Sequence, residues 1–319
     1  MINILQKARD LKHRRYLESL NAQRAKQAQN IRSSQEFKNI YSSLSSTFTI
    51  PFLPNGHKIW AIAMVKNEAD IIEQTVTHLF HQGIDAALIV DNDSTDDTYE
   101  VLERLSEKYP IYLGRDREKA YYQSEKMTWL ADQVVNVGAE WVIPFDADEF
   151  WYGVRQPLDT LLRKNTSSVL YAPIYNQFPL EQGSWALDSQ PHAEGKICFR
   201  AFEGAVIEMG NHSVLRPGLP ANGEIAILHR PWRSFEQFKR KLSEGAQSLS
   251  LTDIAAEKGY HWRALGQYSD QELEDVWNKL ISGEDVPDAL AWRPTGTLRP
   301  LKAEVPGSWS DLGISNQDL

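Results

Sequence analysis

From residue 59 onward, short continuous apolar runs alternate with segments whose apolar residues recur at helical spacing. Ile59–Val65 is an unbroken apolar run of strand length, which is typical of a parallel strand buried on both faces. Apolar residues then recur at helical spacing between Ile72 and Phe80, and Gly83 stands where such a helix would stop. This part of the chain therefore predicts one strand followed by one helix.

The same alternation continues through residue 145. Apolar runs at residues 86–90, 111–113 and 141–145 predict three further strands. Between them, two helices are predicted that carry the apolar residues Val101, Leu102, Leu105, Met127, Leu130, Val134 and Val135. A capping box-like Ser94–Asp97 begins the first of these helices and Pro110 stops it. Strands that alternate with helices predict an α/β fold with a mostly parallel sheet flanked by helices.

Weaker signals describe the rest of the chain. We predict helices over residues 3–40, Leu158–Lys164, 234–245 and 269–281, and strands at residues 168–174, 196–202, 205–209 and 224–228. Residues 42–49 and 51–54 are expected to be a linker, and no element is predicted beyond Asp285. We therefore divide the chain into a helical extension with its linker (1–50), the main domain (51–250) and a C-terminal helical segment with a tail (251–319).

Composition limits the possible partners and location. The chain has 319 residues with a formal net charge of −9, so nucleic acid is not expected as a partner. A single cysteine, Cys198, excludes an internal disulfide and suits a reducing compartment, so we expect a cytoplasmic protein. No apolar run reaches the roughly 18 to 20 residues that a transmembrane helix needs, and no secretory signal is found.

Charge is distributed unevenly along the sequence. Residues 1–50 carry nine basic and three acidic side chains, a net +6, which leaves −15 on the remainder. A solvated or partner-packed helix explains this basic segment. The alternative is peripheral contact with a protein or with the anionic inner face of a membrane.

Polar residues follow three of the four predicted strands. Lys66-Asn67-Glu68, Asp91-Asn92-Asp93-Ser94 and Asp146-Ala147-Asp148-Glu149 all stand at strand ends. In an open parallel sheet the carboxyl ends of the strands meet at one edge, where ligands bind. The sequence therefore predicts an acidic, hydrogen-bonding pocket at this edge.

Asp146 and Asp148 stand two positions apart, so in extended backbone both point the same way. Two carboxylates directed at one point repel unless a cation or a proton lies between them. Mg²⁺ or Mn²⁺ would resolve this repulsion and leave positions for phosphate oxygens and water. The alternative is that the two acids cap the segment that follows.

Three stretches together resemble the successive motifs of a glycosyltransferase family 2-like enzyme with the GT-A fold. They are Ala61-Ile-Ala-Met-Val-Lys-Asn-Glu68, Ile89-Val-Asp-Asn-Asp-Ser-Thr-Asp-Asp-Thr98 and Trp141-Val-Ile-Pro-Phe-Asp-Ala-Asp-Glu-Phe150. The resemblance is strongest over residues 59–150, looser over 190–245, and does not extend to the first 50 residues or to the tail.

The resemblance implies roles for individual residues. The base and ribose of a nucleotide-sugar would be held by Val65, Asn67, Glu68, Asp91, Asn92 and Ser94. Asp146 and Asp148 match the D-x-D that binds metal and diphosphate, with the second aspartate as the direct ligand. Asn92-Asp93 departs from the D-G that is frequent at this place, which leaves the base selectivity open.

Enzymes of this fold often take a third metal ligand from a downstream histidine, and two candidates are present. His229 ends an apolar strand and precedes Arg230, Arg233 and a capped helix, all suitable partners for a diphosphate. His212 follows another strand and is a candidate metal ligand, acceptor contact or base. For both, a structural role is the alternative.

Two further groups of residues are expected near the pocket. Basic and amide side chains on the third strand and the helix after it could approach the donor, with a solvated surface as the alternative: Arg115, Arg117, Gln123 and Lys126. Aromatic residues near site loops could stack on a sugar or fill the core: Trp151, Tyr152, Trp185, Trp232 and Trp262.

The combined prediction is a metal-dependent transferase that moves a sugar from a nucleoside diphosphate, UDP by preference, to a hydroxyl of a glycan or other acceptor. The resemblance implies inversion and a place in polysaccharide biosynthesis. Inversion requires a base, for which Glu149, Glu208, Asp188 and His212 remain open. The alternatives are a nucleotidyltransferase or phosphatase, and a sugar-nucleotide-binding protein without turnover. A phosphatase usually carries its D-x-D on the first strand, and no P-loop is present.

Overall fold

The computed structural model describes residues 2–252, 259–301 and 305–314. Its central sheet has eight strands in the order β1-β4-β3-β2-β5-β10-β7-β13. The four predicted strands form its parallel centre: β2 (Ile59–Val65), β3 (Ala86–Asp91), β4 (Ile111–Asp116) and β5 (Trp141–Pro144). The predicted α/β class with a mostly parallel sheet between helices is therefore confirmed.

Helices cover both faces of this sheet because successive strand residues point to opposite sides. Ala61 and Ala63 of β2 share a core with α3 (Ile72–His81) and α4 (Thr98–Ser106). Trp60 and Ile62 face the other side, where they share a core with α5 (Gln123–Asn136). The continuous apolar run of β2 is therefore explained by burial on both faces.

Four strands extend the central sheet at its edges. β1 (Phe48–Thr49) pairs antiparallel with β4, and β10 (Lys196–Arg200) pairs antiparallel with β5 and with β7 (Val169–Ala172). β13 (Pro220–Asn222) pairs in parallel with β7. The predicted strand at residues 168–174 is thus divided, since Pro173 separates β7 from β8 (Ile174–Pro179), which belongs to a different sheet.

A second sheet of five strands has the order β15-β9-β8-β14-β6. Besides β8 it contains β6 (Glu149–Gly153), β9 (Trp185–Asp188), β14 (Ile225–His229) and β15 (Leu298–Leu301). β15 corrects the prediction that no element follows Asp285. Residues 145–148 connect β5 of the central sheet to β6 of this second sheet, so the D-x-D segment lies where the two sheets meet.

Short elements and helices complete the fold. α6 (Leu158–Lys164) was predicted, and a two-stranded sheet of β11 (Val206–Ile207) and β12 (Val214–Leu215) replaces the strand predicted at 205–209. The C-terminal helices are α7 (Phe235–Ser250), α8 (Tyr260–Leu265) and α9 (Asp270–Ser282). The described residues also contain short 3₁₀ helices at Glu181–Gly183, Met209–Asn211 and Trp309–Leu312.

Helix α7 continues beyond the predicted end at Gly245 for a steric reason. A Cβ atom at Gly245 would lie 2.4 Å from Cε3 of Trp262. The glycine therefore allows α7 and α8 to approach each other, and it does not end the helix. The predicted beginning is confirmed, because the Ser234 hydroxyl accepts a hydrogen bond from the backbone N–H of Gln237.

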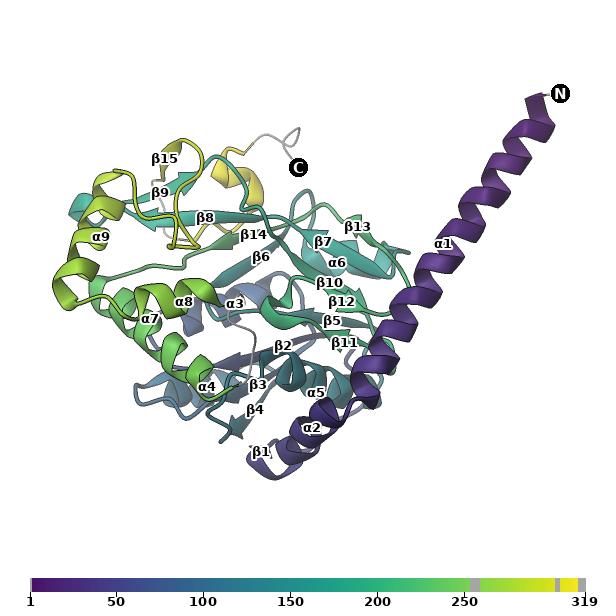
Figure 1. The fold of residues 1–319 in the computed structure, drawn as a ribbon, viewed down its shortest axis with the longest axis horizontal. Helices are drawn as coiled ribbons and strands as arrows, with labels where there is room; N and C mark the ends of the chain where they lie inside the picture. The colour runs from purple at the N-terminus through teal and green to yellow at the C-terminus, as the bar shows by residue number, and fades with distance from the viewer. Residues whose placement is uncertain (1, 253–258, 302–304, 315–319) are drawn as a thin grey trace.

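Two helices precede the central sheet. α1 (Ile2–Ser33) projects from the body at its N-terminal end, while its C-terminal half lies beside β11 and β12 (Figure 1). α2 (Gln35–Thr47) packs Leu44 into the core on the α5 side. Arg32 forms two hydrogen bonds of 2.9 Å to the carboxylate of Asp132, which anchors the extension to α5. Residues 42–47 are therefore helical, which corrects the predicted linker.

None of the helices in the described part of the chain is long and apolar enough to cross a membrane.

Candidate active site

A cavity of about 680 Å³ lies at the carboxyl edge of the parallel strands. Its wall brings together residues that the sequence predicted from all three strand ends and from downstream: Val65, Glu68, Asn92, Gln123, Asp146, Asp148, Glu208, His212, His229 and Trp262. Lys66, from the first predicted strand end, also lines it, as do residues that were not predicted: Tyr121, Glu194, Lys196, Lys241, Glu244 and Trp292. The predicted acidic edge therefore exists, and it also carries positive charges.

Asp148 is a buried anion surrounded by cations. Its Oδ2 atom forms an ion pair with Lys241 of α7 and lies 3.7 Å from a guanidinium nitrogen of Arg233. Its Oδ1 atom lies 3.5 Å from Nε2 of His229. Burial by itself would raise the pKa of Asp148, but the positive charges of Lys241 and Arg233 hold it well below its ordinary value. Asp148 is therefore ionised at neutral pH.

Asp146 has its own cation. Its Oδ2 atom lies 2.5 Å from Nζ of Lys196, and its Oδ1 atom accepts a hydrogen bond of 3.1 Å from Asn211. Asp146 and Asp148 both line the cavity, but different lysines neutralise them. The repulsion that the i, i+2 spacing implied is thus relieved within the protein by Lys196 and Lys241.

Lys196 also lies 3.0 Å from Oε1 of Glu149, which is buried and does not line the cavity. Burial favours the uncharged form of Lys196, yet Asp146 and Glu149 outweigh it and raise the pKa of the ammonium. Burial raises the pKa of Glu149 to about 8. One ammonium therefore contacts the side chains of both Asp146 and Glu149.

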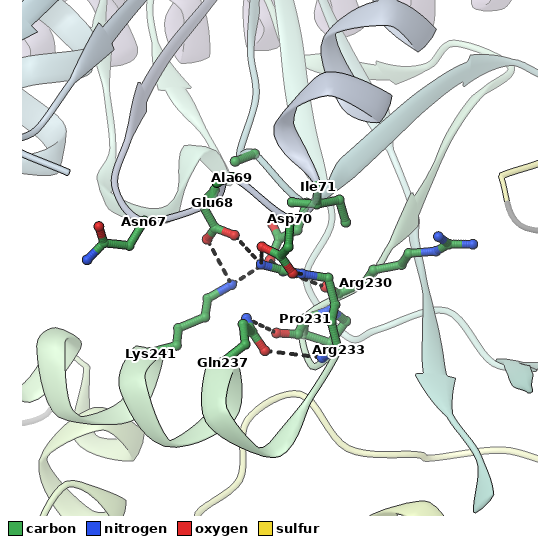
Figure 2. Close-up of polar contacts among 12 residues, drawn as sticks. Asn67, Glu68, Ala69, Asp70, Ile71, Arg230, Pro231, Arg233, Gln237 and Lys241 are labelled. Atoms are coloured by element: carbon green, nitrogen blue, oxygen red, sulfur yellow. Dashed lines mark hydrogen bonds and ion pairs between the residues drawn. The ribbon is translucent and has the colours of Figure 1, made fainter. Parts of the chain in front are cut away.

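Arg233 and Lys241 bridge the end of β2 to the start of α7. Arg233 pairs with Glu68 and lies 2.6 Å from Oδ2 of Asp70, while Lys241 lies 3.8 Å from Glu68 (Figure 2). Burial raises the pKa of Glu68 in spite of these two cations. Arg230 points away from this cluster in Figure 2. Its Nε donates to Gln177 and its guanidinium lies over the ring of Trp185, so Arg230 has a structural environment.

Several predicted binding residues hold the loops in place and do not line the cavity. The backbone N–H of Asn67 donates to the Ser94 hydroxyl, and the Asn67 amide donates to Glu244 of α7. The carboxylate of the buried Asp91 accepts from the backbone N–H of Ser94. Asn67 has a φ of 53°, a conformation that asparagine tolerates better than most residues. These residues therefore shape the two strand-end loops.

Lys126 is fully buried and does not line the cavity. Its Nζ lies 2.6 Å from Oδ2 of Asp116 and donates to the carbonyl of Glu118. The amide of Asn92 donates to the same Asp116 carboxylate at 2.8 Å. Arg115 stacks over Tyr99, and Arg117 is exposed. Of the four side chains expected to approach the donor from this region, the cavity contains Gln123.

The aromatic candidates divide between core and cavity. Trp151, Tyr152 and Trp232 are fully buried, and Trp185 packs on Arg230. Trp262 lines the cavity, as does Trp292, which belongs to the tail where no element was predicted. The indole N–H of Trp232 donates to the carbonyl of Trp292 and so holds that residue at the site.

Asp188, a predicted base, is buried and accepts hydrogen bonds from the backbone of Thr295 and Gly296.

The two histidines have different environments. The Nδ1 atom of His229 lies 2.8 Å from Oδ1 of Asn176, and the ring packs edge-on against Trp292. The Nδ1 atom of His212 lies 2.7 Å from the carbonyl of Gly195. Since a carbonyl only accepts, Nδ1 of His212 carries a proton and Nε2 is free to accept one in the neutral ring. Burial lowers the pKa of both histidines.

Asp148 and His229 fit part of the ligand set of a divalent metal site. No group of three or more His, Cys, Asp or Glu side chains forms a metal-binding cluster within residues 2–252, 259–301 and 305–314. Oδ1 of Asp148 and Nε2 of His229, however, lie 3.5 Å apart and both line the cavity. Carboxylate and imidazole are ligands that Mn²⁺ accepts, with phosphate and water at the remaining positions.

Lys241 was not predicted as a site residue. On α7 the cavity residues Lys241, Glu244, Gly245 and Ser248 follow the i, i+3, i+4, i+7 pattern, which places them on one helical face. Lys196 begins a predicted strand without a distinctive motif.

Comparisons with known proteins give one family match and a set of distantly similar structures. Residues 60–200 match the model of the family described as glycosyl transferase family 2. The S. aureus TarS 1–349 structure in complex with UDP is 13% identical, with 66% of this chain and 70% of that chain covered and a TM-score of 0.36. The same protein in complex with UDP-GlcNAc is 11% identical, with 67% and 77% covered and a TM-score of 0.40. No curated protein sequence matches this chain.

Proposed function

Because residues 60–200 form a glycosyltransferase family 2 domain, we propose that this chain transfers a sugar from a nucleoside-diphosphate sugar, UDP-linked, to a hydroxyl of a glycan, with inversion at the anomeric carbon. The observation that carries the proposal is the cavity, whose wall contains Asp148 and His229 together with Lys196 and Lys241. A diphosphate suits such a wall, because Lys196 and Lys241 offset its negative charge.

A divalent cation, Mn²⁺ or Mg²⁺, belongs to this proposal. Asp148 through Oδ1 and His229 through Nε2 are the residues that would hold it. When bound, such an ion supplies positive charge against the leaving diphosphate. Asp146 contributes by holding the ammonium of Lys196 at the cavity wall, and Lys241 holds the other oxygen of Asp148.

His212 is the base that the geometry favours. Its Nδ1–H donates to the carbonyl of Gly195, which orients the ring and leaves Nε2 to take a proton. In the proposed step the acceptor oxygen forms a bond to the anomeric carbon and its proton passes to Nε2 of His212. The bond from that carbon to the diphosphate oxygen breaks, and its electron pair leaves with the diphosphate. Glu149 and Asp188 do not line the cavity, whereas Glu208 does and is the second candidate.

The experiment that tests the proposal measures nucleotide release. A set of UDP-, GDP-, CDP- and dTDP-sugars is incubated with the protein in Mn²⁺ or in EDTA, with thermal-shift binding of the free diphosphates measured in parallel. We expect turnover with a UDP-sugar in Mn²⁺, its loss in EDTA, and its loss in Asp148→Ala with the fold intact. Turnover retained by Asp148→Ala would contradict the assignment, and turnover unaffected by EDTA would remove the metal.

A separate comparison tests the base. His212→Gln should lower kcat by about a hundredfold or more, the range typical of a lost general base, while nucleotide binding persists. His192→Gln is the matched control, because that histidine contacts Trp292 but does not line the cavity. Equal kcat values for the two variants would eliminate His212 as the base and direct attention to Glu208.

A further inference from the structure

His229 is held from both sides by strand pairing. β14 runs between β8 and β6 in the second sheet, and the register places His229 opposite Asn176 on β8 and opposite Glu149 on β6. Asn176 is 1% exposed, and its Oδ1 atom lies 2.8 Å from Nδ1 of His229. This contact is therefore sealed from water and fixed by the backbone register.

The contact determines which nitrogen of His229 carries the proton. The amide of Asn176 is oriented with its oxygen toward Nδ1 of His229, and an amide oxygen only accepts, so in this orientation Nδ1 is the donor. In a neutral imidazole the other nitrogen, Nε2, then has a free lone pair. Nε2 faces Oδ1 of Asp148 at 3.5 Å, which is longer than an N–H···O hydrogen bond normally is. Two electron-pair donors thus face each other at a distance that leaves room for a shared cation.

We propose that Asn176 is a positioning residue, which locks His229 in the Nδ1–H tautomer and so keeps the Nε2 lone pair directed at a cation held with Asp148. This inference rests on the metal part of the proposed function. Asn176 does not line the cavity, so its effect passes through the imidazole. Trp292, packed edge-on at 4.6 Å between ring centroids, limits rotation of the same ring.

The test combines a measurement of the tautomer with a measurement of metal affinity. Histidine ¹⁵N NMR of the metal-free protein in EDTA reports which ring nitrogen of His229 is protonated, with His229→Gln used to assign the signals. Titration calorimetry with Mn²⁺ gives the affinity. The variants are Asn176→Leu, which removes the acceptor at similar size, and Asn176→Asp, which keeps an oxygen for Nδ1–H.

The neighbouring Gln177→Leu is the matched control. Gln177 is a buried amide on the same strand, but its Oε1 accepts from Arg230 and not from His229. It therefore reports what the loss of a buried amide does to the sheet in general. In Gln177→Leu, the tautomer of His229 and the affinity for Mn²⁺ should be the same as in the wild type.

We expect the wild type and Asn176→Asp to show Nδ1 protonated and Nε2 bare. Asn176→Leu should show a mixture of tautomers and bind Mn²⁺ about 10 to 100 times more weakly. An Nε2–H tautomer in the wild type would overturn the inference, as would wild-type affinity in Asn176→Leu. If Asn176→Leu does not fold, the tautomer of His229 measured in the wild type still tests the inference. Failure of the wild type to bind Mn²⁺ would refute the metal part of the proposed function, and the tautomer measured without metal would still judge the role of Asn176.

Discussion

The buried ion pair between Lys126 and Asp116 offers a quantitative test of how this site is supported. Both side chains are fully buried and 2.6 Å apart. At an effective dielectric constant of 20 their attraction is about 6 kcal/mol. Burial acts against the pair, since it raises the pKa of Asp116 and lowers that of Lys126. Lys126→Met keeps most of the aliphatic stem, so it removes the ammonium with its ion pair to Asp116 and its hydrogen bond to the carbonyl of Glu118.

The part of the penalty that comes from the unpaired charge of Asp116 has an upper bound set by proton uptake. Without Lys126, Asp116 can avoid a buried unpaired charge by taking a proton, and this costs about 1.4 kcal/mol for each pH unit above its ordinary pKa of 3.8. The bound is about 5 kcal/mol at pH 7.5 and about 2 kcal/mol at pH 5. The penalty grows with pH because, in Lys126→Met, the pKa of Asp116 is higher in the folded state than in the unfolded state. As pH rises, the unfolded chain releases this proton first, and the stability of the variant falls.

The assay is urea unfolding at pH 5 and pH 7.5, followed by tryptophan fluorescence and far-UV circular dichroism. Lys126→Met should lose several kcal/mol at pH 7.5 and clearly less at pH 5. The double variant with Asp116→Asn buries no charge, so its loss should be smaller and the same at both pH values. An equal loss for Lys126→Met at both pH values would refute this reasoning. A loss of nucleotide affinity without a loss of stability would show instead that Lys126 contacts the donor directly.

Two further predictions concern other buried charges. The pKa of Glu149 in the folded protein is raised to about 8, so the wild type should lose stability as pH rises from 5 to 8. Glu149→Gln should remove this dependence, which amounts to at most about 1.4 kcal/mol in the free energy of unfolding per pH unit. The assay is urea unfolding without metal, and the same pH dependence in both proteins would argue against a protonated Glu149. Removing residues 2–18 should leave Tm unchanged, because the first described side chains of α1 that form hydrogen bonds with the body are Asn21 and Arg24. Arg32→Ala should lower Tm, because it removes the two hydrogen bonds to Asp132. The same truncation tests the alternative that the basic helix contacts an anionic membrane surface. Under that alternative, vesicles containing anionic lipid retain the full-length protein and release the truncated one, whereas equal retention of the two proteins would exclude the contact.

The acidic edge of the sheet was predictable because its signals are local. Each apolar run identifies a buried strand, and the polar residues that follow it mark the strand's carboxyl end. Parallel order then places Glu68, Asn92 and Asp148 at one edge without knowledge of any long-range contact. The resemblance of the same three stretches to a known family added the expected chemistry, and the family match over residues 60–200 supports it.

Which of these strand-end residues face the cavity could not be predicted. Asn67, Asp91 and Ser94 carry the right chemistry, but their hydrogen bonds are directed into the loops they stabilise. Lys126 was expected near the donor because its helix follows the third strand. Its side chain points instead into the core, where Asp116 compensates its charge.

The sequence by itself determined the parallel sheet, its helices and the acidic character of one edge, since hydrophobic periodicity and strand ends are properties of short segments. Only the tertiary structure decided which cations compensate that edge and how its histidine is held. Lys196 reaches Asp146 across 50 positions, Lys241 reaches Asp148 across 93, and Asn176 reaches His229 across 53. Such contacts depend on the order and register of strands in two sheets and on the approach of α7, which the packing of the whole core sets and no local pattern encodes.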